Sequence, residues 1–262
     1  MKTSQEQNEI LVALLSQYGF NGFEERDNSL YAFILKETFD KKIIDDFAKQ
    51  AQTEFTITII AETNWNYLWE SSFDPVIIGT FCAIRAGFHS AVPDVEHEII
   101  ITPKMSFGTG HHATTFMMIE QMQHINFLNK SVLDFGTGTG ILAILAEKLQ
   151  ACKIVAVDHD DLCIENAKEN ILLNSCKKIE LKKGSTPGGD EKYDIILANI
   201  DKNVIVRNLT QMIGRLNKPG ILLLSGLLSA DQLELLTKAF QHQLIMDKKT
   251  ENNGWICLKF CL

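Results

Sequence analysis

The stretch from Ser131 to Asp158 constrains the fold of this chain more than any other. It begins with a short apolar run, Ser131–Phe135, and continues with three glycines separated by single residues. An apolar segment follows, and then a second apolar run that ends at Asp158. A strand, a glycine turn, a helix and a second strand in this order predict a parallel β-α-β unit of an α/β sheet. Such a unit binds a ligand at the carboxyl ends of its strands.

The residue types of this stretch narrow the kind of ligand. Gly136, Gly138 and Gly140 allow close approach of the backbone to a ligand, because glycine tolerates positive φ. Asp158 ends the second strand, where a carboxylate accepts hydrogen bonds from ribose hydroxyls. The dinucleotide pattern GxGxxG requires a third glycine where this chain has Ile141. The arrangement instead resembles the first motif of class I S-adenosylmethionine (SAM) methyltransferases. This resemblance favours SAM over a nicotinamide or flavin nucleotide. The remaining alternative is a β-α-β crossover in which the turn needs glycine for its conformation alone.

The bulk properties of the chain exclude several other classes. Its 262 residues suffice for one large or two modest domains. The net charge of −8 argues against direct nucleic-acid binding and is compatible with a basic protein partner. Six scattered cysteines without a CxxC pair predict reduced thiols, a cytoplasmic protein and no zinc site. No apolar run is long enough to cross a bilayer, so we expect no membrane association.

The first part of the chain predicts a small α+β module. Its apolar periodicity predicts the order helix, strand, strand, helix, strand, over Glu9–Tyr18, Phe20–Arg26, Ser29–Lys36, Phe39–Ala51 and Phe55–Ala61. We interpret residues 1–62 as a ferredoxin-like module without its first strand. It contains no obvious catalytic residue, so we expect it to recognise the substrate.

Residues 63–104 predict a connection rich in aromatic residues. The segment Asn64–Phe73 contains most of them. We favour a role for these side chains in the core between two domains over a role in binding a partner. A strand-like run, Glu98–Thr102, ends at Pro103. We expect the catalytic domain to follow at residues 105–262.

This last region opens with a glycine-rich loop and a helix that starts at Thr114 or Thr115. The neighbouring His111 and His112 do not predict a metal site, because adjacent loop residues rarely converge on one ion. A loop that closes over a cofactor, with free N–H groups and a threonine hydroxyl, fits the pattern better.

The rest of the chain alternates between strands and helices. From Ser131 onward, strands and helices alternate until a terminal hairpin at Leu244–Asp247 and Trp255–Phe260. Alternation of this kind predicts an α/β fold with a Rossmann-like, doubly wound sheet of seven strands. One of the strands, within Tyr193–Ile200, leads to Asn199 at the same edge of the sheet as Asp158.

Four segments in this order resemble one family: SFGTGHHATT, LDFGTGTGILAI, AVDHDDLCIENAKEN and ILANI. The chain is similar to the bacterial ribosomal protein L-eleven methyltransferases, which belong to the class I SAM-dependent enzymes. The resemblance implies methyl transfer from SAM to lysine amino groups, with the N-terminal amine as a further acceptor. The implied partner is a ribosomal protein of the large-subunit stalk base, free or on the ribosome.

The resemblance also implies which residues form the site. Thr115, Gly136, Asp158 and Asn199 match the cofactor contacts of the family, and Asn199 is also the candidate catalytic residue, facing the transferred methyl group. Threonines at 137 and 139 occupy places where the family often has cysteine or serine, and we expect little consequence. The chain starts almost at its first helix, whereas the family module normally begins with a strand.

The residues after Asn199 bear on the acceptor. Many amino-group methyltransferases have two prolines and an aromatic residue there, whereas this chain has Ile200 and Asp201. Their absence favours a flexible aliphatic amine over a planar amide or a nucleobase amine. The alternatives are methylation of RNA or a small molecule, a nucleotide-dependent oxidoreductase, and a binding module without activity.

Overall fold

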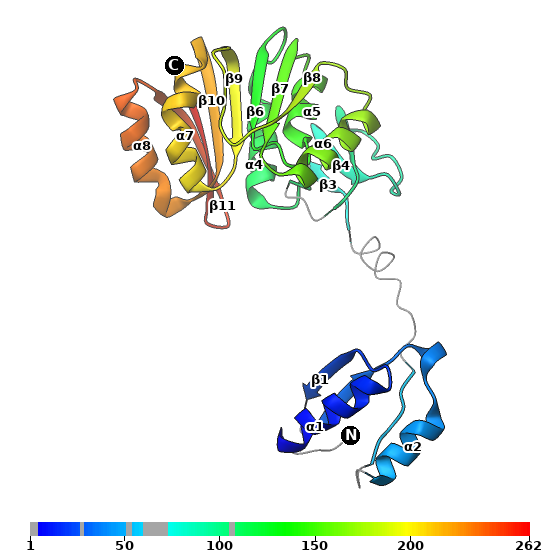
Figure 1. Ribbon diagram of the computed structural model, residues 1–262. Coiled ribbons are helices and arrows are strands. Elements are labelled where there is room, and N and C mark those ends of the chain that lie inside the picture. Colours follow the sequence, from blue (N-terminus) through cyan, green and yellow to red (C-terminus); the bar gives the residue numbers. More distant parts are fainter. Residues whose placement is uncertain (1–4, 27–28, 51–53, 60–72, 105–107) are drawn as a thin grey trace. The chain divides into compact units, whose positions relative to one another are not determined.

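The computed structural model describes residues 5–26, 29–50, 54–59, 73–104 and 108–262. The chain forms two compact units, Met1–Trp69 and Glu70–Leu262 (Figure 1). The contacts thus group residues 70–104 with the larger unit, whereas the predicted division made 63–104 a separate connection. Most of the aromatic segment Asn64–Phe73 lies outside the described residues, and Phe73 is buried.

The smaller unit has the predicted order helix, strand, strand, helix. Its elements are α1 Gln5–Gln17, β1 Gly22–Arg26, β2 Ser29–Phe33, the 3-10 helix η1 Lys36–Thr38 and α2 Lys41–Gln50. The two strands pair antiparallel, and both helices contribute to one apolar core that contains Leu11, Leu15, Phe20, Leu30, Ile44 and Phe47.

The strand predicted at Phe55–Ala61 is wrong for the part that the structure describes. Residues 54–59 have no regular secondary structure, and residues 60 and 61 lie outside the described ranges. Ile57 and Ile59 are exposed, so their alternation does not mark a buried face. A strand needs a neighbour to complete its hydrogen-bond ladder, and no described strand pairs with this segment.

The larger unit is built on the predicted seven-stranded sheet (Figure 1). The strand order is β11-β12-β10-β9-β6-β7-β8. The strands are β6 Ser131–Phe135, β7 Lys153–Asp158, β8 Ile179–Lys183, β9 Tyr193–Asn199, β10 Leu216–Leu228, β11 Ile245–Asn252 and β12 Trp255–Cys261. Strands β6 to β10 pair parallel, whereas β12 lies antiparallel between β10 and β11. The doubly wound sheet with a terminal antiparallel pair is therefore confirmed.

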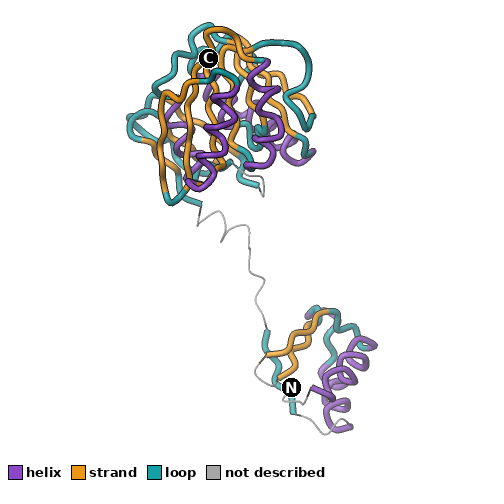
Figure 2. Tube along the Cα trace, turned by 90° about the vertical axis from the view of Figure 1, so that its left-hand side faces the viewer, coloured by secondary structure: helices purple, strands orange, loops and turns teal. Residues whose placement is uncertain are grey.

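Helices cover both faces of this sheet (Figure 2). They are α4 Ala113–Met122, α5 Ile141–Lys148, α6 Asp161–Leu173, α7 Lys202–Gly214 and α8 Gln232–Gln241. Successive residues of a strand belong to two different apolar clusters. Val132 packs with α4 and α5, whereas Leu133 packs with α7 and α8. Since side chains alternate along a strand, both faces of the sheet are apolar and buried.

A second, three-stranded sheet lies in the same unit. It consists of β3 Val76–Ile78, β4 Cys82–Ala86 and β5 His97–Ile101, in that order. The strand predicted at Glu98–Thr102 is thus present, one residue earlier.

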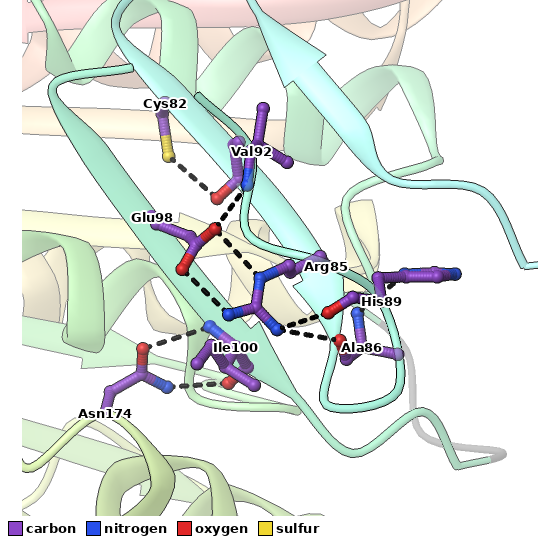
Figure 3. A network of polar contacts seen from close by, with 9 residues as sticks. Cys82, Arg85, Ala86, His89, Val92, Glu98, Ile100 and Asn174 are labelled. Carbon is purple, nitrogen blue, oxygen red and sulfur yellow. Dashed lines mark hydrogen bonds and ion pairs between the residues drawn. The ribbon is translucent and has the colours of Figure 1, made fainter. Parts of the chain in front are cut away.

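A buried ion pair joins two of these strands (Figure 3). Arg85 donates from Nε and Nη2 to the two oxygens of Glu98 at 2.8 and 3.0 Å, and Arg85 is only 9% exposed. The Val92 amide also donates to this carboxylate at 2.8 Å. These hydrogen bonds, chiefly that from Arg85, hold the pKa of Glu98 below its usual value. The pair fixes β5 against β4, directly before the segment that leads to the site.

No helix among the described residues is apolar over a length that would reach across a bilayer.

Candidate active site

A cavity of about 640 Å³ lies where the parallel strands end. This volume is typical of small-molecule sites. Its lining includes the loop before α4 with the start of that helix, the glycine turn, the end of β7 and the end of β9. Thr115, Gly136, Asp158 and Asn199 all lie on its wall, although up to 84 residues separate them in the chain.

Asp158 is the last residue of β7 and is 7% exposed. Its Oδ2 accepts the Gly138 amide at 2.9 Å, and its Oδ1 accepts the Asp160 amide at 3.1 Å. The carboxylate is therefore held by backbone on both oxygens. Each oxygen retains a lone pair, which suits the acceptance of hydrogen bonds from a diol in the cavity.

The glycine turn is tied to the same strand. The amides of Gly136 and Thr137 donate to the Val157 carbonyl at 2.8 and 3.0 Å. Gly136 has φ +78°, and a Cβ added to it would overlap the Ile200 side chain. A side chain at position 136 is thus excluded by backbone conformation and by Ile200, which itself lines the cavity.

Asp134 lies beneath this turn, one residue before the end of β6, and is fully buried. Thr137 donates its hydroxyl to Oδ2 at 2.5 Å, whereas Oδ1 has no hydrogen-bond partner among the described residues. Burial raises the pKa of Asp134 to about 7 against the opposing effect of the Thr137 hydrogen bond. The backbone amide of Ala143 also favours the ionised form of the Asp134 carboxyl.

Asn199 ends β9 on the other side of the cavity and is 8% exposed. Its Nδ2 donates to the Thr115 hydroxyl at 3.1 Å, and Thr115 is completely buried on α4. The Oδ1 of Asn199 has no partner among the described residues. Because Asn199 lines the cavity, this buried acceptor without a partner is a candidate acceptor for a ligand N–H or O–H.

The two histidines before α4 serve different partners. His112 caps the helix, because its Nδ1 accepts the Thr114 amide at 3.3 Å. The Nε2 atom of His111 lies 2.9 Å from the carbonyl oxygen of Asp74. In the described ranges, no group of His, Cys, Asp and Glu side chains is arranged to hold a metal ion.

Sequence reasoning missed several lining residues. Trp255 and Gly226 come from β12 and β10, and only the sheet order brings them to the cavity. No local pattern signals such a placement. Asp201 also lines the cavity and caps α7 by accepting the Asn203 amide at 2.8 Å. Its position before a helical segment is a readable capping signal.

The sheet order and the cavity define the class of this protein. Five parallel strands, β6 to β10, are followed at one edge of the sheet by the antiparallel β12 and then by β11. The cavity lies at the carboxyl ends of the parallel strands, beside the glycine turn and Asp158. Class I SAM-dependent methyltransferases share this arrangement, and the chain is an enzyme of that class. A nucleotide-dependent oxidoreductase is accordingly not favoured.

The comparison with protein families identifies the chain further. The model of the family described as Ribosomal protein L11 methyltransferase (PrmA) matches residues 3–261. The chain belongs to this family.

Individual relatives agree with the family match. A ribosomal protein L11 methyltransferase of Bacteroides fragilis is 34% identical over 97% of this chain and 94% of its own length. The crystal structure of a ribosomal protein L11 methylase from Lactobacillus delbrueckii subsp. bulgaricus is 28% identical, with a TM-score of 0.67 over 72% of this chain and 98% of that chain. A T. Thermophilus 16S rRNA N2 G1207 methyltransferase, solved with AdoMet and guanosine, shares the fold at 17% identity and a TM-score of 0.52, over 60% of this chain and 45% of that chain.

Proposed function

We propose that this enzyme transfers methyl groups from SAM to lysine amino groups of ribosomal protein L11, with the N-terminal amine as a further acceptor. The names of its relatives support this substrate. The structural observation that carries the proposal is that Asn199 lines the same cavity as Asp158 and the glycine turn, while its buried Oδ1 has no partner among the described residues. One side of the cavity suits the cofactor, and the other presents an acceptor to an amine N–H.

The residues present fit SAM. Asp158 would accept hydrogen bonds from the ribose, and Gly136 lets the backbone approach the amino-acid part of the cofactor. Thr115 and Asn199 would lie near the methyl group. SAM supplies an electrophilic methyl group on its sulfonium. The protein holds the acceptor amine in line with it, and alignment of two reactants lowers a barrier by several kcal/mol.

The amine must lose its proton before it attacks. A lysine amine has a pKa of about 10.4 in water. The cavity offers an apolar wall, which includes Phe135, Ile200 and Trp255. Desolvation there would favour the neutral amine. The Asn199 carbonyl would then accept one N–H and direct the nitrogen lone pair toward the methyl group.

The smaller unit is our candidate for recognition of the protein substrate, within the predicted module 1–62. Tyr31 and Phe33 alternate on β2 and are 49% and 38% exposed, on the face opposite the buried Leu30. Aromatic side chains on one exposed sheet face are typical of protein-binding surfaces. Tyr31→Ser with Phe33→Ser would raise the KM for the ribosomal protein and leave SAM affinity unchanged.

The stalk base of the ribosome is the place where we expect the substrate, either free or assembled, in the cytoplasm. The test incubates the enzyme with methyl-labelled SAM and with undermethylated ribosomes or free ribosomal protein L11. We expect label in lysines of that protein, and much less label with Asp158→Ala when SAM is below saturation. Label that appears only in ribosomal RNA would refute the assignment and favour the RNA alternative.

A further inference from the structure

Three asparagines recur at intervals of four residues along α6 and its end: Asn166, Asn170 and Asn174. Residues four apart lie on one face of a helix. This face meets the segment that runs from β5 toward the cofactor loop, because Asn174 bonds the backbone of Ile100 and Asn170 bonds that of Thr102. Figure 3 shows Asn174 beside Ile100.

Of these three asparagines, Asn170 is the one that contacts the glycine turn. Its Nδ2 donates to the Thr139 carbonyl in the glycine turn at 2.8 Å. Its Oδ1 accepts the Thr102 amide at 2.8 Å, and Asn166 donates to the Thr102 carbonyl at 3.1 Å. Asn170 is completely buried, so one amide joins the glycine turn to the segment after β5.

Thr139 makes the second connection. Its hydroxyl donates to the Gly108 carbonyl at 2.7 Å, and its side chain is completely buried. Gly108 has φ +102°, and an added Cβ would lie 3.0 Å from the Thr139 hydroxyl oxygen. Gly108 lines the cavity, whereas neither Thr139 nor Asn170 does. The two side chains therefore contact the site only from behind.

We propose that Thr139 and Asn170 are positioning residues for the cofactor. They join the glycine turn to Thr102 and to Gly108 and thereby hold the turn in a fixed position relative to Gly108, which lines the cavity. Buried polar networks of this kind are costly to break, because each lost partner leaves a desolvated group. The inference rests on the proposed function, namely that SAM occupies this cavity.

Asn174 provides a matched control on the same helix face. Its Nδ2 donates to the Ile100 carbonyl at 2.6 Å, and its Oδ1 accepts the Ile100 amide at 3.0 Å. It therefore fastens the edge of β5 with bonds like those of Asn170, and its Nδ2 also donates to the Asn170 carbonyl at 2.8 Å. Within the described ranges, its side chain has no hydrogen bond to the glycine turn or to Gly108. Loss of Asn174 should lower stability without moving the cofactor site.

The experiment measures SAM affinity by calorimetry and thermal unfolding for Asn170→Ala, Asn174→Ala, Thr139→Val and Thr139→Ser. We expect Asn170→Ala and Thr139→Val to raise the SAM Kd about tenfold. Thr139→Ser keeps the hydroxyl and should stay within about twofold of wild type, and Asn174→Ala should lower Tm with the Kd unchanged. At saturating SAM, kcat should be unchanged in the variants that fold.

Equal SAM affinity of Asn170→Ala and Asn174→Ala, or wild-type affinity of Thr139→Val, would overturn the inference. If Asn170→Ala does not fold, the Thr139 pair decides, since valine and threonine have nearly the same shape. If the wild-type protein itself does not bind SAM, the proposed function fails. If the wild type binds SAM and all four variants bind it equally well, only the present inference fails.

Discussion

Asp158 and Asn199 occupy equivalent places in the sheet but differ in their hydrogen bonds. Both end parallel strands, both are more than nine-tenths buried, and both line the cavity. Asp158 has backbone amides on both oxygens. Asn199 is bonded only through Nδ2, to Thr115, and its Oδ1 is unpaired among the described residues.

This difference in hydrogen bonding suggests different functions for the two residues. A carboxylate with one backbone amide on each oxygen presents its remaining lone pairs in a fixed position, which suits a cofactor that binds in the same way at each turnover. A buried acceptor without a partner is satisfied only when a second molecule arrives. We therefore assign cofactor affinity to the end of β7 and acceptor alignment to the end of β9. The following changes test this division, beginning with the largest expected effect.

The strand between these two, β6, carries Asp134, and its ionisation should dominate the pH dependence of stability. The pKa of this carboxyl rises from 3.8 to about 7 on folding. The folded state holds the proton more tightly, so this contribution is complete below pH 3.8 and is lost as the pH rises through about 7. Between pH 5 and pH 8 the unfolding free energy should fall by about 2–3 kcal/mol more in wild type than in Asp134→Asn.

Asparagine at 134 cannot ionise and still accepts the Thr137 hydroxyl, so it is a conservative control for packing. Denaturant unfolding at both pH values measures the difference. An identical pH dependence in both proteins would show that Asp134 does not titrate in this range.

Removal of the Asp158 carboxylate should have the largest effect on the cofactor. Asp158→Ala frees two loop amides and removes the acceptor for the ribose, so we expect the SAM Kd to rise about 100-fold. Asp161→Ala is the control, because Asp161 is exposed and its one ion pair among the residues that the structure describes is with the exposed Lys183. Calorimetry decides, and unchanged affinity in Asp158→Ala would remove this residue from the site.

The fold around these residues was largely predictable, because the periodicity of each strand and helix from Ser131 onward is local. The pairing of β4 with β5 was not, since their partners are set by long-range contacts and the segment reads as a connection. The positions of Asp158 and Asn199 at the ends of strands were predictable, because an apolar run ends at each of them. The roles of Thr137 and Thr139 were not, because each bonds to a group whose place depends on the folded turn.

Asn199→Ala should act on the transfer step. It removes the open acceptor, and we expect kcat to fall about 30-fold with the SAM Kd changed less than about threefold. Asn203→Ala, on the exposed first turn of α7, is the control. Steady-state rates with ribosomal protein L11 measure kcat, and a change confined to SAM affinity would contradict the assignment.

Thr115→Val should give the smallest effect. It removes the hydrogen bond that orients the Asn199 amide but leaves the carbonyl in place, so we expect kcat to fall about fivefold. Thr115→Ser retains the hydroxyl and should restore the rate. Equal rates for the valine and serine variants would show that the amide is oriented by other contacts.

The division of tasks is tested most directly by the rate of a single methyl transfer to ribosomal protein L11, measured as SAM is raised to saturation. We predict that saturating SAM returns Asp158→Ala to within about tenfold of wild type, because its defect is affinity. Asn199→Ala should remain about 30-fold slow at every SAM concentration. Recovery of Asn199→Ala by SAM, with Asp158→Ala still slow at saturation, would contradict the account.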